Sequence, residues 1–310
     1  MGEYVDIVRF HPVGGSDPVR RDRTLAAMTS PVSVSAVVFS RNEADLLRDC
    51  LPRLTGFDRV LVCDMASTDD TVRVAHEHGA EVIAVPDVPV AERVRQQALD
   101  ALDTDWVLFV DADEHLPTGY RATLDPVIAD PGIAGVRLRY DNVAFGRLLR
   151  HSLQGSAKYA LVHRTRTRYS ATVPAHRPPE FDGPAIDAPA TVPPILHLNF
   201  RSIDQTQEKV LRYAASRADT TVRIDDPIAL LREFARTTVF SGVWRDGRAG
   251  FAVAALHTVG QLSGSLIAAE HDGTLLADLP RRRTRLLGAI ESTQRAAVRT
   301  RDALRRSRPQ

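Results

Sequence analysis

Between residues 32 and 113 the sequence alternates short apolar runs with helical patterns, and this alternation constrains the fold more than any other feature. The apolar runs are VSVSAVVFS, RVLVCD, AEVIAV and DWVLFVDAD. After the first run, apolar residues recur at helical spacing, at Leu46, Leu47, Cys50, Leu51 and Leu54. Strands that alternate with helices form parallel sheets with right-handed crossovers. We therefore expect an α/β fold with a Rossmann-like, mostly parallel sheet flanked by helices.

Polar residues follow three of the expected strands, each at the point where the strand ends. They occupy positions 40–43, 64–69 and 111–114. Ligands of such sheets bind beyond the carboxyl ends of the strands, so these positions should share one crevice. We also expect Asn42 to cap the helix that follows it, and Ser67 or Thr68 to cap the next one.

Three acids close together follow the last of these strands, at Asp111, Asp113 and Glu114. Neighbouring carboxylates raise one another's pKa and destabilise a fold unless a cation or hydrogen-bond donors neutralise them. If the strand continues, Asp111 and Asp113 face the same side, where a divalent ion can bind both. Hard oxygen ligands suit Mg²⁺ or Mn²⁺, whose shell is usually completed by water and phosphate. The pattern favours a nucleotide diphosphate site, the alternative being acids that only cap the next helix.

Several other classes fit poorly. The first loop, SRNEAD, has no glycine, which argues against dinucleotide binding. The Asp-x-Asp follows the fourth strand instead of the first, unlike phosphatases of the haloacid dehalogenase type. A net charge of +1 predicts no bulk attraction to nucleic acid. Two isolated cysteines indicate buried thiols in a reducing cytoplasm, and the apolar window 251–269 contains too many polar residues for a membrane span.

Four segments, in this order and spacing, carry a resemblance to glycosyltransferase family 2, which has the GT-A fold. They are SAVVFSRNEADLLRDCL, VLVCDMASTDDT, RVRQQAL and DWVLFVDADEHLP. The downstream segments HLNFRSIDQTQEKVLRY and LREFARTTVFSGVWRDGRAGFAVAAL are similar to the branch that includes lipopolysaccharide-core glucosyltransferases. The resemblance covers about residues 32–260.

The resemblance implies a set of donor-binding residues. The loop that holds the nucleotide base and ribose, together with the next loop, corresponds to Ser40, Arg41, Asn42, Glu43 and Ser67. Asp64 matches the acid that hydrogen-bonds the base. Arg95 matches a basic residue that approaches the donor, and Asp111 the acid that faces ribose and sugar.

The resemblance also implies a metal site. Asp113 corresponds to the metal ligand, and His197 stands where a histidine completes the metal site in several GT-A enzymes. The alternative for His197 is a core histidine with a satisfied hydrogen bond. The metal and Arg95 would stabilise the departing diphosphate.

The sequence departs from the family pattern at three places. Ala66 and Asp70 replace common glycines, and Asp70 adds a negative charge beside the donor. Gln96 stands where asparagine is usual. His176 is followed by Arg177 where the family often has an acid.

An inverting transfer needs a base that takes the proton of the acceptor hydroxyl. Our first candidate is Glu180, our second Asp182 and our third His176. The alternative for Glu180 is a solvated acid in a Pro-rich loop.

The function expected from the resemblance is that of a metal-dependent, inverting glycosyltransferase. It would use Mn²⁺ or Mg²⁺ and move a hexose from a nucleotide diphosphate sugar, UDP being the commonest carrier in the family. The acceptor would be a hydroxyl of a glycan, a lipid-linked molecule or a small molecule, such as a bacterial cell-envelope glycan. The alternatives are a catalytically silent sugar-nucleotide-binding or scaffold protein, and a nucleotidyltransferase.

We expect three regions: an N-terminal extension at 1–30, the catalytic GT-A domain at 31–226 and a helical C-terminal region at 227–310. Within the second, residues 158–173 resemble a hairpin. The third ends in an arginine-rich tail with a thin apolar stripe. Such helices either contact the inner face of a membrane, join subunits into a homo-oligomer, or stay solvated.

Overall fold

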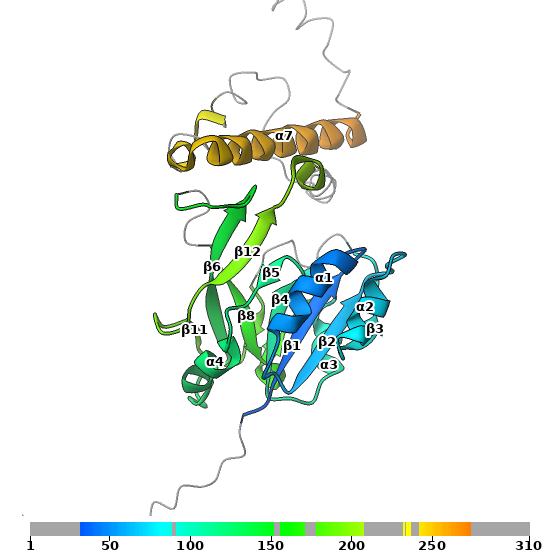
Figure 1. The fold of residues 1–310 in the computed structure, drawn as a ribbon, viewed down its shortest axis with the longest axis vertical. Coiled ribbons are helices and arrows are strands. Elements are labelled where there is room, and N and C mark those ends of the chain that lie inside the picture. The colour runs from blue at the N-terminus through cyan, green and yellow to red at the C-terminus, as the bar shows by residue number, and fades with distance from the viewer. Residues whose placement is uncertain are drawn as a thin grey trace, which may run out of the picture.

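The computed structural model describes residues 32–88, 91–151, 156–170, 178–207, 232, 234–236 and 242–273. These residues form a mixed sheet with helices packed on it and a long C-terminal helix (Figure 1). The expected α/β class is confirmed. The sheet is mixed because an antiparallel half follows the parallel half along the chain. The domain boundaries given above stay predictions.

The parallel half of the sheet is built from the strands that the sequence predicts. Its order is β3-β2-β1-β4, and each neighbouring pair is parallel. The strands are β1 Val34–Ser40, β2 Arg59–Asp64, β3 Glu81–Ala84 and β4 Trp106–Asp111. The chain moves outward from β1 to β3 and then returns to the other side of β1. The switch point therefore lies between β1 and β4, where sheets of this kind bind ligands.

Helices cover both faces of these strands. In one core, Leu47, Val74 and Leu124 of the helices pack with Val38 and Val110 of the strands. In the other core, Leu99 of α3 packs with Val37 and Phe109. Alternate strand residues thus face opposite cores. The helices are α1 Ala44–Cys50, α2 Thr71–Glu77, α3 Arg95–Asp100 and α4 Tyr120–Ile128, with 3₁₀ turns at η1 Leu51–Arg53 and η2 Ala91–Arg93.

The antiparallel half continues the sheet beyond β4. The order continues β8-β6-β12-β5, with β7 and β11 also pairing with β6. Its strands are β5 Glu114–His115, β6 Gly135–Ala144, β7 Arg147–Leu148, β8 Ala157–His163, β11 Ala185–Asp187 and β12 Ile195–Phe200. In Figure 1, β6 and β12 extend away from β1–β3 toward α7 Gly247–His271, which follows the turn η5 Val243–Asp246.

Some local expectations are wrong. In the described part of the expected hairpin, residues 158–170, β8 is followed by η3 Arg164–Arg166 and then by β9 Thr167–Arg168, which pairs with β10 Glu180–Phe181 instead of β8. Asn42 caps no helix, because α1 has Glu43 at its N-cap. The cap of α2 is Asp70 instead of Ser67 or Thr68. Both cysteines are buried, as expected.

The C-terminal part of the chain contains one apolar helix. Within the described residues, Val243–His271 alone has the length and apolar composition that crossing a membrane would require. The sequence predicted no spanning segment in this region. Length and composition are weak evidence here, because core helices of globular proteins share both.

Ala66 occupies a backbone conformation that favours glycine, with φ of 58°. This explains why glycine is usual at that position. We predict that Ala66→Gly raises the free energy of unfolding by up to about 1 kcal/mol, because glycine relieves the left-handed strain. Ala122→Gly, on the exposed side of α4, should lower it by about 1 kcal/mol. Urea unfolding of both variants checks the sign, and an equal loss in both would contradict the assignment.

Candidate active site

The carboxyl ends of three neighbouring strands bring the predicted donor residues together. Ser40 at the end of β1 is paired in register with Asp64 at the end of β2. On its other side, β1 pairs Phe39 with Asp111 at the end of β4. Asp64, Ser40 and Asp111 therefore lie in a row along one edge of the sheet, as the sequence predicted. Their roles in binding stay predictions.

The two loops after β1 and β2 are joined to each other by side chains. The backbone N–H of Asn42 donates to Ser67 Oγ at 2.9 Å, and Asn42 Oδ1 accepts the N–H of Thr68 at 2.7 Å. Asp64 accepts the N–H of Ser67 at 3.2 Å. Asn42 tolerates φ of 54° here, as Asn commonly does. These hydrogen bonds hold Ser67 and Asn42 in place.

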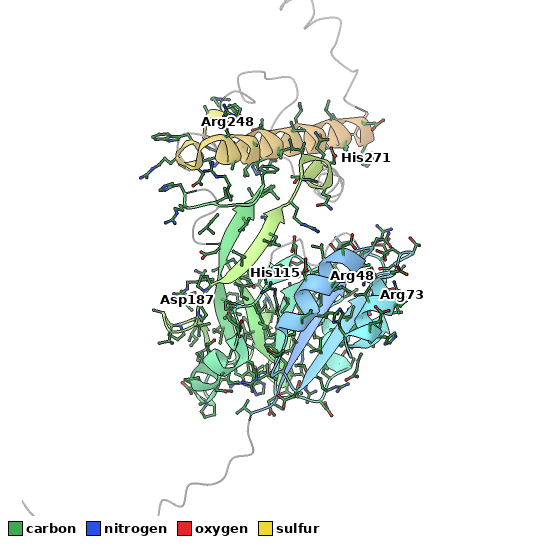
Figure 2. All side chains as sticks on the ribbon, viewed as in Figure 1. Arg48, Arg73, His115, Asp187, Arg248 and His271 are labelled. Atoms are coloured by element: carbon green, nitrogen blue, oxygen red, sulfur yellow. The ribbon has the colours of Figure 1, made fainter. Side chains whose placement is uncertain are left out.

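Three charged side chains of these loops have partners of their own. Arg41 forms an exposed ion pair with Asp87 at 2.9 Å. Asp70, which departs from the family pattern, pairs with Arg73 at 2.6 Å, and Figure 2 labels Arg73 on the surface. The added negative charge of Asp70 is therefore compensated on α2 itself. Ser40 Oγ donates to Glu43 Oε2 at 3.3 Å.

The acidic segment after β4 turns sharply instead of continuing as a strand. β4 ends at Asp111, and Glu114 begins β5, which pairs antiparallel with β12. The Glu114 side chain is fully buried, and its Oε2 accepts the N–H of Asp111 at 3.0 Å. This turn replaces the expected extended Asp111–Asp113 arrangement. It points Glu114 inward beneath the end of β4.

The cation that the acidic cluster requires is supplied by Lys158 of β8. Its Nζ donates to Asp111 Oδ2 at 2.6 Å and lies 2.5 Å from Glu114 Oε1. The same ammonium lies 4.8 Å from the centre of the Tyr140 ring on β6. One lysine therefore bridges two carboxylates and rests on an aromatic face.

These contacts set the charge states of the cluster. Burial would raise the pKa of Asp111, but Lys158 outweighs it and holds that pKa below its ordinary value. Burial raises the pKa of Glu114 to about 7, although Lys158 acts in the opposite direction. Burial would lower the pKa of Lys158, yet Asp111 and Glu114 hold it well above its ordinary value. The lysine is thus charged at neutral pH.

His197 completes a group of potential metal ligands. Carboxylate oxygens of Asp111 and Glu114 and a ring nitrogen of His197 all lie within 4.8 Å of one another. His197 Nε2 is buried and forms an ion pair with Asp113 Oδ1 at 3.3 Å. Burial would lower the pKa of His197, but Asp113 and Glu114 outweigh it and raise that pKa. The carboxylate oxygens of this group suit Mn²⁺ or Mg²⁺, and the imidazole offers one further ligand nitrogen.

Arg95 lies buried behind this edge of the sheet. Its guanidinium sits 4.9 Å from the centre of the Phe109 ring and 5.6 Å from that of Tyr169. Burial would lower the pKa of Arg95, but Tyr169, Glu92 and Asp111 raise it. Arg95 Nε has no hydrogen-bond partner within the described residues. Contacts with these two rings, which meet edge to face, favour the charged guanidinium and fix its position.

The candidate bases are not brought to the acidic cluster. Glu180 is exposed on β10 and pairs in register with Arg168. The backbone N–H of Asp182 donates to the carbonyl of Arg166. The guanidinium of Arg166 donates to the carbonyl of Gly132, just before β6. This region lies at the start of β6, the opposite end of the sheet from Asp111. His176 lies outside the described residues, and the role of each stays a prediction.

Sequence reasoning missed Lys158 and Tyr140 and assigned no role in the site to Glu114. The acids required a positive partner, but that partner comes from a strand 47 residues away. The available signal was Lys158 itself, because a lysine at the start of the apolar run YALV needs a carboxylate when its strand is buried. The register between β4, β8 and β6 places Lys158 beside Asp111 and Glu114, and sequence patterns do not specify that register.

Comparison with known families shows what the part of the chain that carries this site is similar to. Residues 35–177 match the model of Glycosyl transferase family 2. The segment includes all three strand ends that form the acidic edge. The branch that includes lipopolysaccharide-core enzymes stays a prediction.

Related proteins share the same part of the chain. A glycosyltransferase of Rickettsia felis is 33% identical over 98 residues, which is 31% of this chain and 34% of the relative. The glycosyltransferase AglJ of Haloferax volcanii is 32% identical over 118 residues, 37% of this chain and 36% of the relative. A TPR repeat-containing protein of Synechococcus elongatus is 37% identical over 93 residues, 30% of this chain and 23% of the relative. The chain thus spans about a third or less of these relatives.

Solved structures are similar at lower identity. A mannosyltransferase from Pyrobaculum calidifontis in complex with GDP-Man and Mn²⁺ is 18% identical, covers 86% of this chain and 81% of its own, and has a TM-score of 0.43. A glucosyl-3-phosphoglycerate synthase from Mycobacterium tuberculosis, in complex with Mn²⁺, UDP and glucosyl-3-phosphoglycerate, is 18% identical, covers 59% and 79%, and has a TM-score of 0.36.

Replacing Lys158 tests its part in holding the acidic cluster together. Lys158→Met leaves Asp111 and Glu114 without their cation, so we predict a loss of about 2 kcal/mol in the free energy of unfolding. The loss stays below that of a fully buried pair because the side chains of Lys158 and Asp111 are 33% and 40% exposed. Urea unfolding without divalent ions measures it.

The matched control is Arg73→Met, which removes an arginine that pairs with two exposed acids, Asp70 and Glu77. It should cost less than about 1 kcal/mol. A similar loss in both variants would show that Lys158 is an ordinary surface cation.

Proposed function

We propose that this protein is a metal-dependent glycosyltransferase that takes a hexose from a nucleotide diphosphate sugar. The observation that carries the proposal is the ligand group of Asp111, Glu114 and His197 at the switch point of a sheet whose sequence matches family 2. Such an edge offers hard oxygen ligands beside the position where a diphosphate binds. The names of two relatives as glycosyltransferases support the same class.

The donor occupies the edge formed by the ends of β2, β1 and β4. In this proposal Asp64 and the joined loops with Asn42 and Ser67 bind the base and ribose, and UDP is the favoured carrier. Ser40, Arg41 and Glu43 belong to the same loop. Because the loops are already tied together by hydrogen bonds, the donor loses little binding energy to ordering them.

A bound Mn²⁺ or Mg²⁺ would be held by Asp113 and His197 with Asp111 or Glu114, and would supply positive charge to the diphosphate. Lys158 neutralises Asp111 and Glu114, so that the cluster does not repel the anionic donor. Arg95 adds a fixed positive charge behind the edge. Both cations are held by the fold before any ligand binds.

The transfer is proposed to be inverting. An acceptor hydroxyl of a glycan, a lipid-linked molecule or a small molecule would attack the anomeric carbon while a base takes its proton. Glu180, Asp182 and His176 remain the candidates from sequence. The base must reach the acidic edge. Either substrate binding brings one of these three candidates there, or another group of the protein acts as the base.

Removing one carboxylate tests the metal site. We predict that Asp113→Ala abolishes sugar transfer and Mn²⁺-dependent donor binding, because the diphosphate loses the cation that neutralises it, while the variant stays folded. A thermal-shift panel of nucleotide diphosphates and their sugars, with and without Mn²⁺, measures binding, since a ligand of the folded state raises Tm. Donor hydrolysis with Mn²⁺ measures turnover.

The control is Asp45→Asn, which changes an acid on α1 whose side chain is 94% exposed. It should behave as the unchanged protein. Unchanged turnover in Asp113→Ala would refute the site assignment. Donor binding without any hydrolysis or transfer would favour a silent sugar-nucleotide-binding protein instead.

A further inference from the structure

One face of α7 is apolar and packs against β6 and the segment that follows it. Ala249 and Val253 form a small core with Ala144 of β6 and Leu149. The helix is also fixed at its start, where the carboxylate of Asp246 accepts the backbone N–H groups of Arg150 and His151 at 2.8 and 3.0 Å. These contacts orient the helix across the ends of β6 and β12 (Figure 1).

A second face of α7 is apolar and exposed. Phe251, Val259 and Leu266 are 55%, 47% and 39% exposed. At 3.6 residues per turn they fall within an arc of about 80°, on the other half of the helix from Val253. Trp244, in the turn just before the helix, is 59% exposed. Phe251 contacts the ring of Phe234 edge-on at 5.5 Å and still keeps most of its surface exposed. A helix that is apolar on both faces needs a second covering surface.

The charged side chains at the start of this face are basic. Arg245 and Arg248 are exposed beside Trp244, and Figure 2 labels Arg248 near the start of α7. From Gly247 to Ala269 the sequence has no acidic residue, and two exposed acids, Glu270 and Asp272, follow at the end of the helix. Residues 281–310, downstream of the helix, contain ten arginines and two acids. The combination of an exposed tryptophan, arginines and an apolar stripe matches the chemistry of an anionic lipid surface.

We propose that the exposed face of α7 docks on the surface of an anionic lipid bilayer, with Trp244, Arg245 and Arg248 at the level of the headgroups. A second copy of the chain fits less well, because two basic faces repel each other. Crossing the bilayer fits less well too, since the opposite face of the helix is held on β6. The helix therefore lies in the plane of the membrane. This inference does not rest on the proposed enzymatic function.

Flotation with lipid vesicles tests the proposal. The full chain should bind vesicles of phosphatidylcholine mixed with phosphatidylglycerol, and bind vesicles of phosphatidylcholine alone much more weakly. The triple variant Phe251→Ser, Val259→Ser, Leu266→Ser should lose at least about tenfold in affinity, because less apolar area is buried. Added salt should weaken binding of the full chain by screening the arginines.

The matched control is Ile186→Ser on β11, which removes an apolar side chain that is 36% exposed far from α7. It should bind vesicles as the full chain does. Thermal melting checks that both variants fold. Equal vesicle binding by the triple variant, or no vesicle binding by the full chain, would overturn the proposal. A concentration-dependent dimer that the triple variant abolishes would assign the face to a second copy and also overturn it.

Discussion

The bridge from Lys158 to Asp111 and Glu114 is the interaction on which the rest of the structure depends. It joins the end of β4, the start of β5 and the start of β8, three segments that are distant in sequence. Without a cation, two carboxylates would meet at the edge of a buried sheet and repel. With it, the chain can turn sharply after Asp111 and place Glu114 in the interior. The lysine thus makes the acidic edge compatible with a stable fold.

The same strands connect this edge to the C-terminal helix. β6 carries Tyr140 beneath the Lys158 ammonium and, four residues on, Ala144 against α7. β12 carries His197 near the acids, and Phe200 packs against the same small core as α7. A sugar-transfer site and a lipid-facing helix on shared strands would present lipid-linked acceptors at a fixed distance from the donor. This arrangement relates the two proposals without making either depend on the other.

The sequence predicted what local patterns determine. Alternating strands and helices predict a parallel sheet with right-handed crossovers, and the polar strand ends of such a sheet lie on one edge. The order β3-β2-β1-β4, with β4 beside β1, is known only from the structure. Pairing between distant strands is not encoded in this way. Three features are therefore known only from the structure. They are the pairing of β9 with β10 instead of β8, the inward turn at Glu114 and the role of Lys158. The positions of Glu180 and Asp182 depend on the same long-range pairing.

The central claim is that this acidic edge, already balanced by one lysine, binds a divalent ion together with a nucleotide diphosphate. Electron paramagnetic resonance of Mn²⁺ titrated into the protein, with and without UDP, tests it most directly. The account predicts one Mn²⁺ bound per chain, bound more tightly when UDP is present. Free Mn²⁺ throughout the titration, or binding that ignores UDP, would contradict it.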